Sequence, residues 1–253
     1  MNFPILFLAA ATGLIPLVPK KAPSTALAVM SAPLKHQHLL SPVLHVNPGV
    51  PNSPHVALTF DACTGKVDDR ILSTLINNRI KATVFVTARW LKRNPVALGQ
   101  MLTHADLFEI ENHGARHLAA IDHPAMLYTL KAAGSPAGLR SEILDGAAAV
   151  KSATGREPRW YRGAGAEYSS TAVSQIISLN FKLAGYSLSG DGGAGYSTKR
   201  AATAVANAKN GDVIIAHINQ PAKPAGAGVA EGVLALKAKG FVFVRLDEHH
   251  IAH

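Results

Sequence analysis

His55-Val56-Ala57-Leu58-Thr59-Phe60-Asp61 is a strand-like run of mostly apolar residues that ends on an acid. Four further runs of this kind each end on a polar residue that can take part in catalysis. They cover residues 107–113, 159–162, 183–191 and 212–217 and end on His113, Arg162, Asp191 and His217. Where parallel strands form a sheet or barrel, the chemistry lies at their carboxyl ends. The five strand ends therefore predict one shared pocket, and with it an enzyme.

Helical patterns alternate with the strands along the rest of the chain. Apolar periodicity and end signals predict helices over residues 67–78, 94–104, 139–153, 170–179, 198–209 and 229–239. Two more strands are expected over residues 81–88 and 241–246. This alternation is typical of right-handed βα units, so the predicted fold class is α/β, with a mostly parallel sheet or barrel.

Composition sets the class of protein and the partners to expect. A chain of 253 residues can form one α/β domain, and its 48% hydrophobic and 16% charged residues are those of a compact protein. The net charge of +9 and the pI near 9.8 favour anionic partners. The basic residues are dispersed and no nucleic-acid-binding motif accompanies them, so no nucleic acid is expected. A single cysteine, Cys63, excludes an internal disulfide.

The N-terminal segment has the pattern of an export signal. Residues 3–18 carry no charge, and Ala26-Leu27-Ala28 is a small-x-small cleavage site. The apolar stretch is short for a membrane span, so no stable membrane insertion is expected. We therefore predict an export signal over residues 1–28, a proline-rich lead-in over 29–54 and a catalytic domain over 55–253. The predicted location is periplasmic or extracellular.

Two motifs offer metal ligands or a base. His113 and His117 are four residues apart, a spacing that can bring two imidazoles onto one zinc ion. Gly114 favours a turn leaving a strand over a helix, and two solvated surface histidines are the alternative. Asp61 can act as a metal ligand or a general base, or as a turn-forming or helix-capping acid.

Three further residues complete a possible acid–base set. His217 closes an apolar strand and can serve as a general acid if a carboxylate holds its charged form. Asp191 is the candidate for that carboxylate, although its flanking glycines also fit a simple turn. Arg162 can hold Asp61 in its charged form, or it can be a surface arginine.

The motifs, in this order, resemble the polysaccharide deacetylases of the NodB-homology type, carbohydrate esterase family 4, over residues 55–247. Thr59-Phe60-Asp61 is similar to the first family motif, and His113 to His117 is similar to the metal-binding motif. The resemblance implies a role for each of six residues: Asp61 as catalytic base, His113 and His117 as metal ligands, Arg162 as the group that orients the base, His217 as general acid, and Asp191 as the group that tunes it.

The resemblance also implies a fold, an activity and a cofactor. It implies a distorted (β/α) barrel and a hydrolase that uses a divalent metal, Zn²⁺ in the first place, to remove N-acetyl groups. The implied substrate is an acetylated, N-acetylglucosamine-containing polysaccharide such as peptidoglycan. Two alternatives stay open: hydrolysis of a small, cyclic amide on the same fold, and a glycan-binding protein without catalysis.

Three positions depart from the family pattern. Ala62 replaces the second aspartate of the first motif, normally a metal ligand. Gly163-Ala164-Gly165 follows Arg162 in place of the usual proline and aromatic residue, and Gly192 replaces a tryptophan after Asp191. The third metal ligand is therefore open: the Cys63 thiolate, a carboxylate from elsewhere, or water. Alternatively, Cys63 is an inert buried cysteine.

Overall fold

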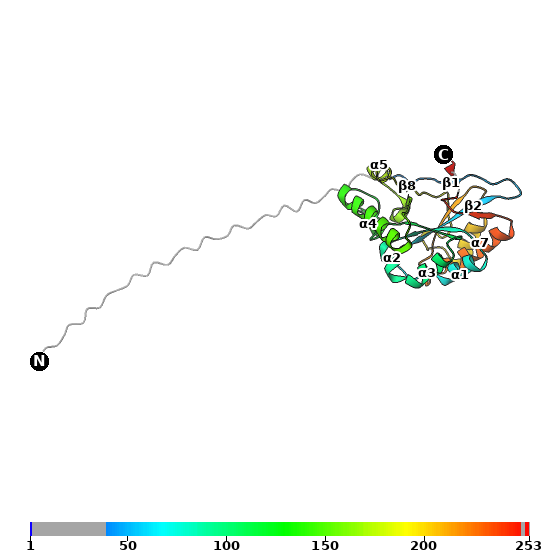
Figure 1. Ribbon diagram of the computed structural model, residues 1–253, viewed down its shortest axis with the longest axis horizontal. Coiled ribbons are helices and arrows are strands. Elements are labelled where there is room, and N and C mark those ends of the chain that lie inside the picture. Colours follow the sequence, from blue (N-terminus) through cyan, green and yellow to red (C-terminus); the bar gives the residue numbers. More distant parts are fainter. Residues whose placement is uncertain (2–38, 249–250, 253) are drawn as a thin grey trace. The chain divides into compact units, whose positions relative to one another are not determined.

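One parallel sheet carries the fold (Figure 1). Its strands run in the order β8-β7-β4-β3-β2-β10-β9, and β11 also pairs with β2. The computed structural model describes residues 1, 39–248 and 251–252, so the predicted export signal and the start of the lead-in lie outside the described residues. The strands are β2 (His55–Ala62), β3 (Ala82–Val86), β4 (Phe108–Asn112), β7 (Trp160–Tyr161), β8 (Lys182–Leu183), β9 (Leu188–Ser189), β10 (Val213–His217) and β11 (Val242–Val244).

Every strand pair in this sheet is parallel. Within the described residues no pairing joins the two outer strands, β8 and β9, so the curled sheet is an open barrel. The predicted fold class, a distorted and mostly parallel (β/α) barrel, is confirmed.

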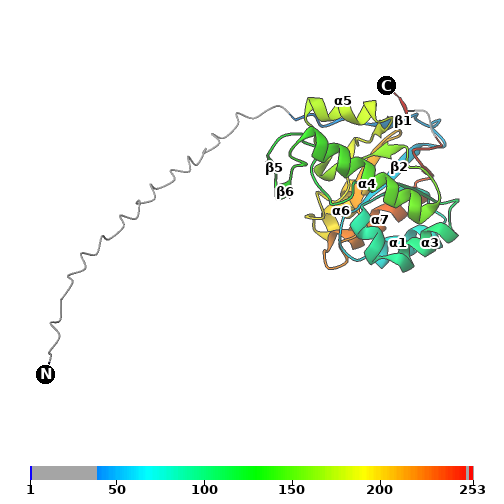
Figure 2. The ribbon, with the colours of Figure 1, turned by 60° about the vertical axis from the view of Figure 1, so that its left-hand side comes forward.

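Helices surround the sheet on its outer side (Figure 2). Most begin where a side chain caps the first backbone N–H groups, as Thr87 does for α2 and Ser135 for α4. The six predicted helices are present with ends shifted by up to four residues; the six-residue α2 was not predicted, because it is too short to show a period. The helices are α1 (Asp69–Asn77), α2 (Ala88–Arg93), α3 (Pro95–Thr103), α4 (Pro136–Thr154), α5 (Ser170–Ser178), α6 (Thr198–Ala206) and α7 (Ala225–Ala238).

The pleat of β2 sorts its side chains onto two faces. Val56, Leu58, Phe60 and Ala62 lie in the main hydrophobic core between sheet and helices. The alternate residues, Ala57, Thr59 and Asp61, face the barrel interior, because successive side chains of a strand point to opposite faces.

The prediction of one strand over residues 183–191 is wrong. The structure has two short strands here, and they pair with different neighbours, β8 with β7 and β9 with β10. Between them the backbone leaves the sheet at Gly185, where an added Cβ would lie 2.0 Å from the carbonyl oxygen of Pro42. This close approach lets the chain cross from one outer strand to the other.

Short pairings outside the main sheet complete the fold. In the lead-in, β1 (His45–Val46) pairs antiparallel with β12 (Ile251–Ala252). A hairpin that the sequence did not predict, β5 (Met126–Leu127) with β6 (Leu130–Lys131), follows the loop after β4. Among the described residues, no helix is both long and apolar enough to cross a membrane. The division into signal, lead-in and catalytic domain stays a prediction.

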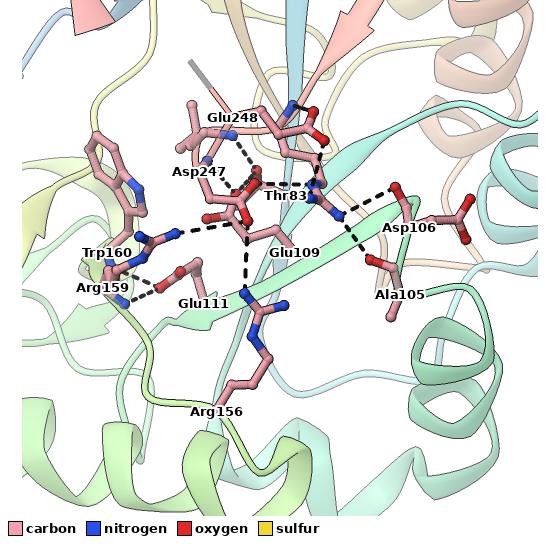
Figure 3. A network of polar contacts seen from close by, with 12 residues as sticks. Thr83, Ala105, Asp106, Glu109, Glu111, Arg156, Arg159, Trp160, Asp247 and Glu248 are labelled. Carbon is pink, nitrogen blue, oxygen red and sulfur yellow. Dashed lines mark hydrogen bonds and ion pairs between the residues drawn. The ribbon is translucent and has the colours of Figure 1, made fainter. Parts of the chain in front are cut away.

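Two buried carboxyl groups lie on β4 before its carboxyl end (Figure 3). Glu109 accepts a hydrogen bond from the Thr83 hydroxyl at 2.6 Å and one from the Asp247 N–H at 3.2 Å. Glu111 accepts the backbone N–H groups of Arg159 and Trp160, both at 2.8 Å. Burial, and then the neighbouring charge of Glu109, raises the pKa of Glu111 to about 9. Glu111 therefore keeps its proton in the folded protein at neutral pH.

This retained proton predicts how stability depends on pH. The unfolded chain loses the Glu111 proton near the ordinary carboxyl pKa of about 4.3, whereas the folded protein keeps it up to about pH 9. Between these values the folded state binds more protons, so the free energy of unfolding falls as the pH rises. We expect Glu111→Gln, whose amide oxygen can still accept both N–H groups, to flatten this decline in urea unfolding between pH 5 and 8. The exposed Glu231→Gln is the control; an unchanged slope in Glu111→Gln would contradict the assignment.

Candidate active site

A pocket of about 630 Å³ opens at the carboxyl ends of the strands. Its lining includes four of the six residues singled out from the sequence, namely Asp61, His117, Asp191 and His217. The other two, His113 and Arg162, are fully buried behind it and contact Asp61. The structure therefore brings all six predicted residues together around one pocket.

A buried ion pair fixes Asp61 at the end of β2. The Arg162 guanidinium donates from Nη1 to Asp61 Oδ1 at 3.1 Å and to Thr59 Oγ1 at 2.9 Å. Its Nη2 donates to the carbonyl of Gly185 at 2.9 Å. Burial alone would raise the pKa of Asp61, but the charges of His113, Arg162 and His217 outweigh it and hold that pKa below its usual value. Asp61 is thus a carboxylate at neutral pH, and only its Oδ1 is bonded to the arginine.

The ring orientation of His113 is set by Arg162 as well. His113 Nδ1 lies 2.6 Å from the Arg162 carbonyl oxygen, and only an N–H can form that bond. The Nε2 atom consequently faces the pocket side, 3.7 Å from Asp61 Oδ2 and 3.7 Å from Cys63 Sγ. In a metal-binding histidine, one ring nitrogen is usually held by a hydrogen bond to the protein, and the other ring nitrogen binds the metal.

Cys63 follows Asp61 by two residues, and both side chains line the pocket. Its sulfur and one ligand atom each from His113 and His117 all lie within 4.8 Å of one another, the one such group of three among the described residues. Burial would raise the pKa of the Cys63 thiol, but hydrogen bonds with His113, His117 and His217 hold it well below its usual value. The cluster thus offers a thiolate and two imidazoles.

This ligand set fits a zinc ion. Tetrahedral Zn–N and Zn–S bonds of about 2.0 and 2.3 Å place the two ligand atoms about 3.5 Å apart. The observed separation of His113 Nε2 and Cys63 Sγ, 3.7 Å, is close to that value. Two imidazoles and a thiolate also match the preference of zinc for nitrogen and sulfur ligands, and three protein ligands leave a fourth position open.

The loop that carries His117 is held by a residue that the sequence analysis missed. Glu142 of α4 is fully buried, and its Oε1 accepts the backbone N–H groups of Arg116 at 2.8 Å and Leu118 at 3.1 Å. Gly114 and His117 both adopt positive φ, +84° and +66°, in this tight turn. No local motif marks Glu142, since it lies about 25 residues away in sequence and meets the loop only through the fold.

His217 and Asp191 form the second acid–base pair. His217 ends β10 directly beside Asp61 of β2 in the parallel register. Asp191 Oδ2 accepts from the His217 backbone N–H at 2.7 Å and lies 2.9 Å from the ring Nδ1. Burial would lower the pKa of His217, but the hydrogen bond to Asp191 and the charges of Asp191 and Cys63 raise it well above its usual value. His217 therefore carries a proton at neutral pH.

The residues that depart from the family pattern lie in different surroundings. Ala62 points into the main hydrophobic core, away from the pocket, so it leaves no gap in the cluster. Gly165 and Gly192 line the pocket, but neighbouring side chains fill the space beside them: an added Cβ would lie 2.7 Å from Leu127 at Gly165 and 2.2 Å from the Tyr196 ring at Gly192. Cys63, the residue after Ala62, lies in the cluster with His113 and His117.

Comparison with known proteins identifies the family. The polysaccharide deacetylase profile matches residues 49–184, which is more than half of the chain. The chain belongs to the polysaccharide deacetylase family. This match confirms the family and the reaction class expected from the motifs, deacetylation of a polysaccharide. Deacetylases of this family are metal-dependent in general, in keeping with the Cys63–His113–His117 cluster. No curated protein sequence matches the chain significantly.

Several solved structures have the same fold as this chain. The peptidoglycan deacetylase PdaC of Bacillus subtilis is similar with a TM-score of 0.62 and 22% identity, covering 79% of this chain and 91% of PdaC. Bacillus subtilis PdaA, a family 4 carbohydrate esterase, has a TM-score of 0.63 and 18% identity, covering 82% and 83%. A family 4 pseudoenzyme of Bacillus anthracis has a TM-score of 0.61 and 19% identity, covering 79% of this chain; the chain spans 66% of that protein's length.

The contacts of Glu142 predict a role in holding the metal-binding loop. Glu142→Ala leaves the N–H groups of Arg116 and Leu118 without their acceptor, so we expect zinc affinity to fall about 10–100-fold, as for lost partners of metal ligands. Glu142→Gln keeps the accepting oxygen and should retain most of the affinity. Competition with a chromophoric chelator measures both, with circular dichroism confirming the fold. Wild-type affinity in Glu142→Ala would contradict this role.

The Asp191 contact predicts the titration of His217. Removing the negative charge in Asp191→Asn takes away the group that stabilises the protonated ring, so His217 should lose its proton at a lower pH. A ¹H–¹³C NMR titration of the histidine rings measures this shift. Asp145→Asn, at an exposed position of α4, is the matched control. The idea fails if Asp191→Asn leaves the His217 titration where it was.

Proposed function

We propose that this chain is a metal-dependent hydrolase that removes N-acetyl groups from an N-acetylglucosamine-containing polysaccharide, and that the polysaccharide is peptidoglycan. One observation carries the proposal: the Cys63–His113–His117 cluster lies in a single pocket between two charged pairs, Asp61 with Arg162 and His217 with Asp191. A binding protein has no need of both a held base and a held acid. Export to the periplasm or the cell exterior, where such a polymer lies, is part of the proposal and is supported by the predicted signal.

We assign the metal as Zn²⁺, held by His113 and His117 with Cys63 as third ligand. A zinc ion held there would supply a Lewis acid for the acetamide carbonyl and would lower the pKa of a bound water molecule towards about 7. The Cys63 thiolate serves as the metal ligand in place of the aspartate carboxylate that Ala62 has replaced. Ala62, the last residue of β2, points into the hydrophobic core, and the next residue, Cys63, lies on the pocket side beside His113, which supports this substitution.

Asp61 acts as the general base. Its pKa is held low by His113, Arg162 and His217 against the effect of burial, so it is charged and able to accept the proton of the attacking water. Arg162 bonds Oδ1 and leaves Oδ2 to accept that proton. Because Arg162 is itself fixed by Thr59 and the Gly185 carbonyl, the base cannot turn away from the pocket.

His217 acts as the general acid. Its Nδ1 is bonded to Asp191, so the other ring nitrogen, Nε2, is the one that can donate to the leaving amine of the sugar. Asp191 keeps the ring protonated until that transfer. We propose that a backbone N–H at Ala164 or at Gly165, which lines the pocket, donates to the oxyanion that forms from the acetyl carbonyl, because this donation requires no side chain.

Acetate release tests the proposal. The chain from residue 39 onward would be offered peptidoglycan and N-acetylglucosamine oligomers, with added Zn²⁺ and then with a chelator. We expect release that the chelator abolishes and that fresh Zn²⁺ restores. No release from any glycan by the zinc-loaded protein would overturn the proposal and favour a small-amide hydrolase or a glycan-binding protein.

Variants of Cys63 test the thiolate ligand. We expect Cys63→Ala to lose zinc affinity and nearly all acetate release, and Cys63→Asp, which offers a carboxylate at the same place, to recover part of both. The Co²⁺-loaded wild type should show a thiolate-to-cobalt charge-transfer band that Cys63→Asp lacks. The ligand assignment is wrong if Cys63→Ala binds one Zn²⁺ as tightly as the wild type.

A further inference from the structure

The outer wall of the pocket is built from segments that play no part in the acid–base chemistry. Tyr128 lies in the two-residue turn between β5 and β6, and Glu167 follows the short helical turn Ala164–Ala166 after β7. The Tyr128 hydroxyl donates to Glu167 Oε1 at 2.7 Å, and Tyr186 lines the same pocket. We call Tyr128, Glu167 and Tyr186 the outer wall.

Tyr128 is presented to solvent at a conformational cost. It is 76% exposed, and its φ of +54° is rare for a bulky residue. Such a conformation persists only where the surroundings fix it, and it occurs often at ligand-binding sites. The hydrogen bond to Glu167, and then the charge of that carboxylate, raises the pKa of Tyr128, so its hydroxyl stays a donor.

Among the described residues, Glu167 differs from Asp61 and Asp191, the other carboxylates of the pocket, because no cationic side chain pairs with it. Asp61 is paired with Arg162, and Asp191 with His217. Within the described part of the chain, Glu167 forms no ion pair, and Tyr128 is its one hydrogen-bond partner among side chains. A half-buried carboxylate with unused acceptor positions therefore faces the substrate pocket.

We infer that the outer wall binds the sugar ring next to the one that is deacetylated and disfavours a ring that carries a carboxylate. Resting on the proposed function, this makes Glu167 a specificity-determining residue. The enzyme then acts where its outer wall meets neutral, hydroxyl-rich N-acetylglucosamine, and it acts poorly where that wall meets the lactyl carboxylate of N-acetylmuramic acid.

The physical reason is a match of hydrogen-bond roles and of charge. An ionised glutamate only accepts hydrogen bonds, and sugar hydroxyls can donate them. A carboxylate on the ligand has no donor to offer and adds a repulsion between like charges that a partly desolvated pocket screens poorly. The two tyrosines add flat apolar faces with polar edges, which suit a sugar ring of either charge.

The basic surface of the protein does not oppose this selection. The net charge of +9 attracts an anionic polymer at long range. Screening at physiological salt limits such fields to about 8 Å, so contact inside the pocket is decided by its own groups. Attraction of the polymer and rejection of its acidic ring at the outer wall are therefore compatible.

A matched pair of substrates tests the inference. One is a tetrasaccharide of alternating N-acetylglucosamine and N-acetylmuramic acid, and the other is the same tetrasaccharide with its carboxylates converted to amides. We expect the wild type to deacetylate the inner N-acetylglucosamine ring, both of whose neighbours carry the carboxylate, with a kcat/KM on the order of ten times higher in the amidated form, as for one like-charge contact. Glu167→Gln, which can still accept the Tyr128 hydroxyl, should bring this ratio close to one by raising activity on the acidic form.

Two controls separate charge from other effects. Glu157→Gln removes an exposed carboxylate outside this pocket and should leave the ratio unchanged. Higher salt should reduce the preference of the wild type and leave Glu167→Gln unaffected. A preference for the amidated form that persists in Glu167→Gln would overturn the inference.

Calorimetric binding of the same two tetrasaccharides to the zinc-loaded protein distinguishes this inference from the proposed function. If neither is deacetylated but the ratio of their Kd values falls towards one in Glu167→Gln, the outer wall selects as inferred and the proposed catalysis is wrong. If both are deacetylated and Glu167→Gln alters neither the kcat/KM ratio nor the Kd ratio, the catalysis stands and the inference is wrong.

Discussion

The buried guanidinium of Arg162 is the constraint on which the rest of the site depends. A fully buried charge is tolerated only when it is paired and its hydrogen bonds are satisfied. Arg162 meets this requirement with Asp61, Thr59 and the carbonyls of Ala184 and Gly185. These partners come from β2 and from the chain after β8. The hydrogen bonds of the Arg162 side chain therefore hold both segments in place. The carbonyl of Arg162 then orients His113, which follows β4, and this contact links Asp61 to the Cys63–His113–His117 cluster.

The barrel interior has two polar regions with different surroundings. Phe85 of β3 lies between them: it is the register neighbour of Asp61 on one side and of Glu111 on the other, and Arg162 stacks on its ring at 4.3 Å. Around Asp61, the groups are charged and adjoin the pocket. On β4, the carboxyls of Glu109 and Glu111 are closed in, and burial raises the pKa of both. This second region joins β4 to the chain around Asp247 and Arg159.

The departures from the family pattern become intelligible through the geometry of β2. Because the strand continues without a bulge through Ala62, its pleat sends that side chain into the hydrophobic core and sends the next one, Cys63, to the pocket. The local backbone thus turns the side chain at position 62 away from the cluster and the side chain of Cys63 towards it. Leu127 and Tyr196 pack against the two pocket glycines, Gly165 and Gly192, and the β5–β6 hairpin and Glu167 supply the outer wall of the pocket.

The sequence by itself determined the parallel α/β fold, the strand ends that meet in the pocket, and the six residues that gather there, because hydrophobic periodicity and strand-end placement are local properties. It did not determine that residues 183–191 form two strands, since that break depends on the approach of Pro42 to Gly185. Nor did it reveal Glu142, the hairpin or the uncompensated charge of Glu167, which act through contacts between distant segments. For Cys63 it left ligand and inert core residue both open. Only the tertiary structure placed the sulfur beside His113 and His117, because a distance between residues 50 positions apart is set by the fold.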